Sequence, residues 1–144
     1  MIPRRLGWFL ALWSLAFACT HVAWALGWRG GMEPGMPAIT DRPWFLAYDL
    51  LAAALMFAAA PVAVALGSGR ASLLLRRLTV ACSALALARG LPALVLDVAD
   101  STYDVVGFGA DVWFTVAGAC GFALLSATVP DHRAPRRAAT ALPG

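Results

Sequence analysis

Residues 43–66, PWFLAYDLLAAALMFAAAPVAVAL, decide the fold of this chain because they form a long apolar run with a single charged residue, Asp49. At ~1.5 Å of rise per residue, a helix over this run is long enough to cross a hydrocarbon core of ~30 Å. Three further apolar runs of comparable length occupy residues 6–26, 73–96 and 105–129. The sequence therefore predicts an all-α protein with four transmembrane helices.

The composition and the connections between the runs support this fold class. Of the 144 residues, 61% are hydrophobic and only 13% are charged, which is too apolar for a typical soluble domain. The short link 67–72 predicts that the runs on either side of it are antiparallel neighbours. We expect one domain over residues 1–129, and a disordered basic tail over the polar, Pro-rich residues 130–144.

The basic residues predict the orientation of the four helices. All eleven are arginines, and most lie before the first run, between the second and third runs, or after the fourth. Because cytoplasmic segments carry an excess of basic residues, we expect both termini in the cytoplasm and a multi-pass protein of the plasma (inner) membrane. The net charge of +3 then reflects topology, so the lipid bilayer is the predicted partner and nucleic acid is not. The arginines in these three segments are Arg4, Arg5, Arg70, Arg76, Arg77, Arg133, Arg136 and Arg137.

The first run has one alternative interpretation, a secretory signal. Arg4 and Arg5 precede it, and Ala16-Phe17-Ala18 resembles a cleavage site between small residues. However, the apolar residues continue well past this site, and the run contains several bulky tryptophans. A transmembrane helix is the better interpretation.

Each run places one ionisable residue in the half that we expect to face outward: His21, Asp49, Arg89 and Asp111. Helical rise puts all four roughly 8 to 10 Å below the outer boundary. Ionisable groups within a membrane are costly, and they usually face the bundle interior and mark a function. We therefore expect these four side chains to share one layer as catalytic groups, with Arg89 partly neutralising both carboxylates.

Aromatic and hydroxyl residues near this layer are candidates for binding a substrate. The Gly- and Pro-rich segment 28–42 predicts a loop that folds back over the outer end of the bundle. Together these features predict an aromatic-lined pocket that opens toward the outer leaflet. Its candidate substrate-binding residues are Trp24, Tyr48, Phe108, Thr115 and Tyr103.

Other interpretations of the same residues remain open. Asp49, Arg89 and Asp111 are also compatible with a buried ion-pair network that only fixes helix register. Neither a metal nor a cofactor is expected, since one histidine and two aspartates in separate helices lack the spacing of a metal site. The three cysteines form no Cys-x-x-Cys pair, which argues against thiol exchange. An aromatic belt at the outer interface is the alternative role for Trp24, Trp28, Trp44 and Trp113.

Residues 21–27, His-Val-Ala-Trp-Ala-Leu-Gly, resemble the His-x-x-Trp-Ala-x-Gly signature of a bacterial family of small four-helix membrane proteins of unknown function. In that family the signature ends the first span. The resemblance extends to Arg89-Gly90 and to a polar entry into the fourth span, and covers residues 5–128, whereas Asp111 departs from the usual pattern. It implies the four-helix fold and topology, and it implies no reaction.

Three functions are compatible with these features. The first is a cofactor-independent acid/base enzyme that acts on a lipophilic small molecule, of the isoprenoid or terpenoid cyclase or isomerase type. The second is an accessory or structural membrane subunit that binds another membrane protein through its small-residue helix faces. The third is a proton or small-solute transporter, which is disfavoured because the inner half of the predicted spans offers no charged stepping stones.

Overall fold

The computed structural model describes residues 2–32, 35, 37–100 and 105–128, and the regular structure in this part of the chain is entirely helical. Each of its four long helices is apolar and long enough to cross a membrane, which confirms the predicted all-α class and a multi-pass membrane protein. The predicted tail, 130–144, lies outside the described residues. In chain order the elements are α1 (Ile2–Ala25), the short 3-10 helix η1 (Ile39–Asp41), α2 (Pro43–Gly67), α3 (Leu73–Asp100) and α4 (Val105–Ala127).

Two helices extend beyond their predicted apolar runs. The first helix starts at Ile2 and therefore includes Arg4 and Arg5, while α3 continues past residue 96 to Asp100. The apolar run measures the part of a helix that suits the membrane, whereas the helix itself continues until a residue disfavours it.

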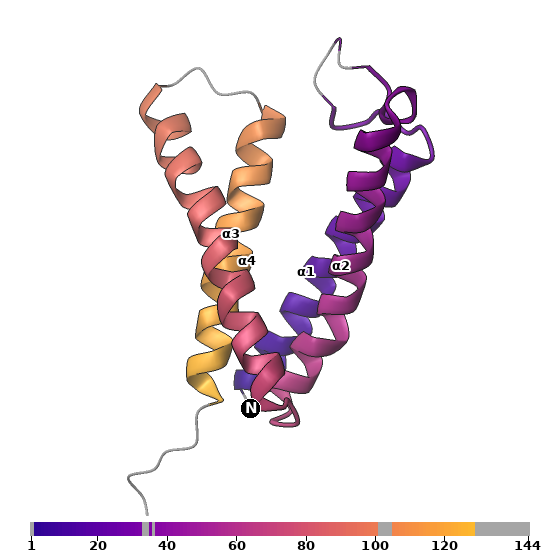
Figure 1. Ribbon diagram of the computed structural model, residues 1–144. Coiled ribbons are helices and arrows are strands. Elements are labelled where there is room, and N and C mark those ends of the chain that lie inside the picture. Colours follow the sequence, from indigo (N-terminus) through magenta and orange to yellow (C-terminus); the bar gives the residue numbers. More distant parts are fainter. Residues whose placement is uncertain (1, 33–34, 36, 101–104, 129–144) are drawn as a thin grey trace, which may run out of the picture.

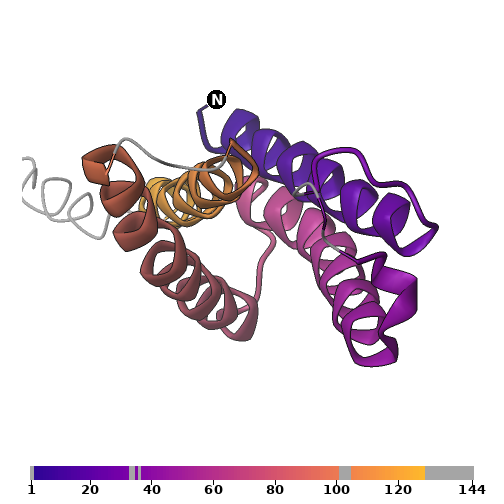
Figure 2. The same cartoon turned by 90° about the horizontal axis from the view of Figure 1, so that it is seen from above.

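The four helices form two pairs (Figures 1 and 2). The first pair consists of α1 packed along α2, and the second pair consists of α3 packed along α4. Fewer contacts, made mainly by α4 with α1, join the two pairs. The pairs converge at the end where the chain begins and diverge toward the opposite end (Figure 1).

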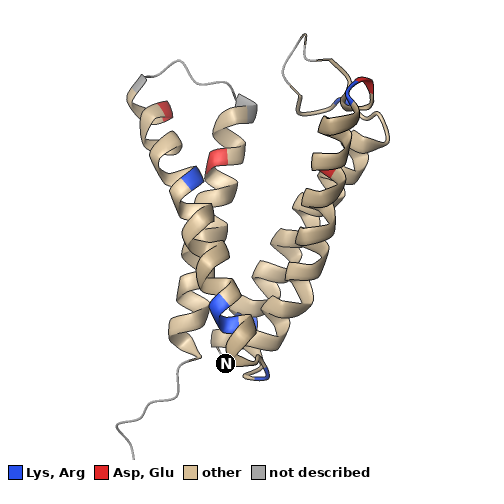
Figure 3. Cartoon of the chain, viewed as in Figure 1, with Lys and Arg blue, Asp and Glu red and all other residues tan. Residues whose placement is uncertain are grey.

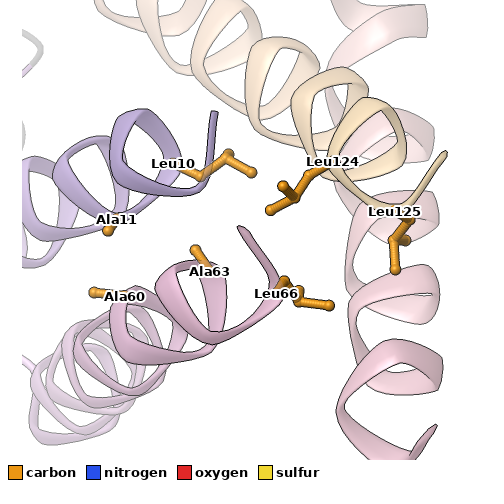
Figure 4. Packing of buried hydrophobic residues seen from close by; sticks show 7 residues of the cluster. All are labelled: Leu10, Ala11, Ala60, Ala63, Leu66, Leu124 and Leu125. Carbon is orange, nitrogen blue, oxygen red and sulfur yellow. The ribbon is translucent and has the colours of Figure 1, made fainter. Parts of the chain in front are cut away.

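A cluster of buried apolar side chains holds the converging ends together (Figure 4). Its residues come from the start of α1, the end of α2 and the end of α4, so it joins the first pair to the second. We call it the apolar cluster; its members are Leu10, Ala11, Ala60, Ala63, Leu66, Leu124 and Leu125.

Glycines let the helix backbones touch within each pair. A Cβ atom added to Gly7 of α1 would lie 2.6 Å from the carbonyl oxygen of Ala63, and one added to Gly67 of α2 would lie 2.7 Å from that of Pro3. In the second pair, a Cβ on Gly118 would lie 2.7 Å from the carbonyl oxygen of Ser83. Small residues allow this close approach. Transmembrane helices depend on such packing because the hydrophobic effect does not drive them together in lipid.

Arginines gather at the end of the molecule where the chain begins, which we call the basic end (Figure 3). One of them, Arg76 near the start of α3, donates hydrogen bonds to the hydroxyl and the carbonyl oxygen of Thr128 at 3.2 and 3.3 Å. Carbonyl groups at the end of a helix lack partners within it, so Arg76 caps α4. The same bonds hold the start of α3 against the end of α4.

The glycine contact in the first pair is testable by replacing Gly7 with alanine. Both Gly7→Ala and the control Gly109→Ala gain the same helix propensity, but the Cβ at position 109 meets nothing within 4 Å. We expect Gly7→Ala to be less stable than Gly109→Ala by about 1–3 kcal/mol, because the overpacked contact must shift. Unfolding of the two variants in the same detergent measures the difference, and equal stabilities would contradict the contact.

Candidate functional site

His21 and Asp49 form a buried hydrogen-bonded pair between α1 and α2. The Nδ1 atom of His21 bonds Oδ1 of Asp49, and the two side chains are 9% and 4% exposed. His21 lies one turn before the end of α1, and Asp49 lies in the second turn of α2. Small residues one turn from the pair on each helix, Ala18 in α1 and Ala53 in α2, are also buried.

The second ring nitrogen of His21 and the second carboxylate oxygen of Asp49 are buried and have no hydrogen-bond partner among the described residues. These atoms are Nε2 of His21 and Oδ2 of Asp49. An ionised carboxylate only accepts hydrogen bonds, so with Asp49 ionised the proton of a neutral imidazole resides on Nδ1 and Nε2 keeps a free lone pair. Leaving buried polar atoms unpaired costs free energy, so these two atoms call for an explanation.

Two aromatic rings pack against the imidazole of His21. The ring centroids of Phe17 and Trp24 lie 4.4 Å and 5.1 Å from that of His21. The indole N–H of Trp24 also donates a 2.9 Å hydrogen bond to the carbonyl of Gly30 in the loop after α1. This loop turns back at Gly27, whose φ of +94° favours glycine. The first residues of the loop thus fold back at the end of the first pair, where Gly30 is hydrogen-bonded to Trp24.

Arg89 and Asp111 form the second ionic pair, between α3 and α4. Nη1 of Arg89 donates a 2.5 Å hydrogen bond to Oδ1 of Asp111. The carboxylate is buried, whereas the arginine side chain is 57% exposed and its guanidinium lies 5.7 Å from the ring centroid of Phe114. The neighbouring Gly90 allows this approach, since a Cβ there would lie 2.7 Å from the carbonyl oxygen of Asp111.

The four ionisable residues therefore form two separate pairs, one in each helix pair. We predicted that Arg89 serves both carboxylates, but it pairs with Asp111 while Asp49 pairs with His21. Two phenyl rings lie between the pairs, because Phe17 contacts His21 and also lies 5.8 Å, centroid to centroid, from Phe114. The arrangement is two polar sites connected by aromatic contacts.

The other predicted substrate-binding residues occupy different environments. Tyr48 is 59% exposed and stacks on Phe45, so it lies on the outside of α2. Thr115 lies against Gly90, and its hydroxyl is buried without a hydrogen-bond partner among the described residues. Phe108 is half-buried, and Tyr103 lies outside the described residues. Trp24 contacts His21, and Thr115 lies beside Gly90, the neighbour of Arg89.

The contacts between the two helix pairs involve aromatic residues that were not predicted as part of the site. Trp13 stacks on Trp113 with ring centroids 4.1 Å apart, and its indole N–H donates to the carbonyl of Trp113 at 3.4 Å. Trp113 therefore packs between α1 and α4 and is not a belt residue. Helical spacing did predict that Phe17 shares a face with His21, four residues later, but it gave no signal for Trp113, which follows Asp111 by two.

Within the described ranges, no three histidine, cysteine, aspartate or glutamate side chains lie close enough together to hold a metal ion.

Comparison with known proteins gave no relative. No family model, no curated protein and no solved structure matches this chain. The resemblance at residues 21–27 stays a prediction, and the site must be interpreted from its own geometry.

The separation into two pairs can be measured by double-mutant cycles. We expect His21→Gln and Asp49→Asn to be coupled by about 0.5–3 kcal/mol, and Arg89→Gln and Asp111→Asn likewise, because each pair shares a direct bond. The cross cycle of Asp49→Asn with Arg89→Gln should be additive within about 0.5 kcal/mol. The free energies of unfolding of the single and double variants give these values. A large cross term would show that all four residues act as one cluster.

Proposed function

We propose that this chain is a multi-pass protein of the plasma membrane, an antiparallel four-helix bundle with both termini in the cytoplasm. The four long apolar helices support this, as does the gathering of arginines at the basic end (Figure 3). Because basic segments stay in the cytoplasm, the basic end is the cytoplasmic end. The two ionic pairs then lie in the outer half of the bilayer.

We further propose that the protein is a cofactor-independent acid/base enzyme that acts on a lipophilic small molecule. The observation that carries this proposal is the orientation of His21, with Nδ1 held by Asp49 and Nε2 free of any partner in the described structure. A carboxylate that fixes one imidazole nitrogen leaves the other available as a base and stabilises the imidazolium that forms. The proposed substrate is an isoprenoid or terpenoid, and the proposed enzyme is of the isomerase or cyclase type.

The reaction that suits this dyad best is a proton shift. Nε2 of His21 removes a proton from an activated carbon of the substrate, and the electron pair of that C–H bond moves into the adjacent unsaturated system. Asp49 stabilises the imidazolium, whose Nε2 proton exchanges with water before a proton is delivered to a different carbon and the neutral ring is regenerated. The double bond has moved, and the enzyme ends in its starting protonation state.

The residues between the two ionic pairs suit a lipophilic substrate. Phe17 and Phe114 provide apolar surface next to His21, while Arg89 offers exposed guanidinium N–H groups toward a polar group of the substrate. Asp111 holds that guanidinium in place. Because Nε2 is buried, a substrate reaches it only after a neighbouring ring moves, and Trp24, bonded to the loop at Gly30, is the proposed gate.

Transport is less well supported than acid/base chemistry. The apolar cluster occupies the junction of α1, α2 and α4 at the basic end. A proton or solute path needs polar groups or water across the whole bilayer. The two ionic pairs lie in the half of the helices away from this cluster.

The proposed reaction predicts carbon-bound deuterium in a lipid. The purified protein in nanodiscs is incubated in D₂O with isoprenoid lipids extracted from bacterial membranes, and the lipids are analysed by mass spectrometry after back-exchange in H₂O. We expect one lipid species to gain deuterium, and the rate to fall by about 10²- to 10⁴-fold in His21→Gln and Asp49→Asn, because these changes remove the base or its orienting group.

A matched variant controls for loss of charge. Asp41→Asn changes an exposed carboxylate in η1, and this variant should incorporate deuterium as fast as the unmodified protein. Absence of deuterium from every lipid, or equal rates in all of these proteins, would contradict an acid/base function.

A further inference from the structure

Trp8 of α1 separates two grooves at the basic end. One groove, with a volume of about 460 Å³, lies between α1 and α2, and its walls include Leu15, Pro61 and Val64. It ends at Arg70, in the link between α2 and α3. The lining of this groove is apolar along its length and cationic at one end.

The second groove runs along the other side of Trp8 and has a volume of about 530 Å³. Phe9 and Leu12 form its apolar wall, and Arg4 and Arg5 lie at its end. Both grooves are therefore apolar along most of their length and end at arginine. They share the Trp8 side chain.

The contact between α1 and α2 explains the position of Trp8. Gly7 and Gly67 bring the two backbones together, which leaves no room for an indole in the contact itself. The next residue, Trp8, consequently stands on the surface with 51% of its area exposed. An amphipathic tryptophan ring at this level suits the boundary between lipid chains and headgroups.

The arginines of the two grooves belong to one edge of the molecule. The Cα atom of Arg4 would lie 3.3 Å from a Cβ on Gly67, and Arg70 follows Gly67 by three residues. A 2.9 Å hydrogen bond from the Arg70 amide to the carbonyl of Ala65 keeps this turn folded against α2. Among the described residues, the lining of neither groove includes an acidic side chain.

We propose that these grooves bind one anionic diacyl phospholipid, with its phosphate on the arginines and one acyl chain on each side of Trp8. Each basic residue near an anionic headgroup contributes attraction, and the two apolar channels match two chains of one lipid. The proposal rests on the transmembrane arrangement proposed above, and it is independent of acid/base chemistry at His21.

The test is native mass spectrometry of the full chain in a neutral detergent, titrated with defined lipids. We expect phosphatidylglycerol to bind at least about tenfold more tightly than phosphatidylcholine, because the latter has no net charge to match the arginines. Lysophosphatidylglycerol, with one chain, should bind more weakly than the diacyl lipid. Soluble glycerol phosphate should not displace it, since the headgroup alone leaves both channels empty.

Two single substitutions with the same charge change separate the grooves from general charge attraction. Arg70→Gln should weaken phosphatidylglycerol binding about fivefold, the effect of one basic residue near an anionic lipid. Arg77→Gln, in the first turns of α3 and outside both linings, should leave the affinity unchanged. Equal binding of the two diacyl lipids, displacement by glycerol phosphate, or equal losses in the two variants would overturn the proposal. Deuterium incorporation should persist in Arg70→Gln, so this test and that of the acid/base function fail separately.

Discussion

Close contact between helix backbones at small residues is the constraint on which the rest of this structure depends. Apolar helices in lipid gain little from the hydrophobic effect, so packing and polar bonds must hold them together. Gly7 and Gly67 bring α1 against α2, and Gly90 brings α3 against α4. Aspartate has a short side chain, so the bond of Asp111 to Arg89 on the neighbouring helix requires the close approach at Gly90.

This constraint makes each helix pair a unit with its own ionic bond. The apolar cluster joins the units at the basic end, and aromatic contacts such as Phe17 with Phe114 join them farther along. His21 and Arg89 are therefore connected through aromatic rings and not through a shared carboxylate. The arrangement combines a histidine–aspartate pair, an apolar wall and an exposed guanidinium, and the proposed acid/base function rests on these parts.

The four helices could be predicted from the sequence because an apolar chain segment without water must satisfy its backbone hydrogen bonds internally. The depth of His21 and Asp49 could also be estimated, since helical rise per residue is fixed. Their pairing could not, because it depends on the rotation of each helix, and rotation follows from contacts such as that of Gly90 with Asp111. The role of Trp113 was missed for the same reason, since depth alone does not distinguish a lipid-facing ring from one stacked on Trp13.

The proposed function requires that Asp49 holds Nδ1 of His21 and leaves Nε2 as a free base. Solid-state nitrogen NMR of histidine-labelled protein in lipid bilayers, with His132→Gln to remove the other histidine, tests it most directly. The account predicts a neutral ring protonated at Nδ1, with an unprotonated Nε2, and loss of the hydrogen-bonded Nδ1 signal in Asp49→Ala. A ring protonated at Nε2 alone, or a spectrum unchanged by Asp49→Ala, would contradict it.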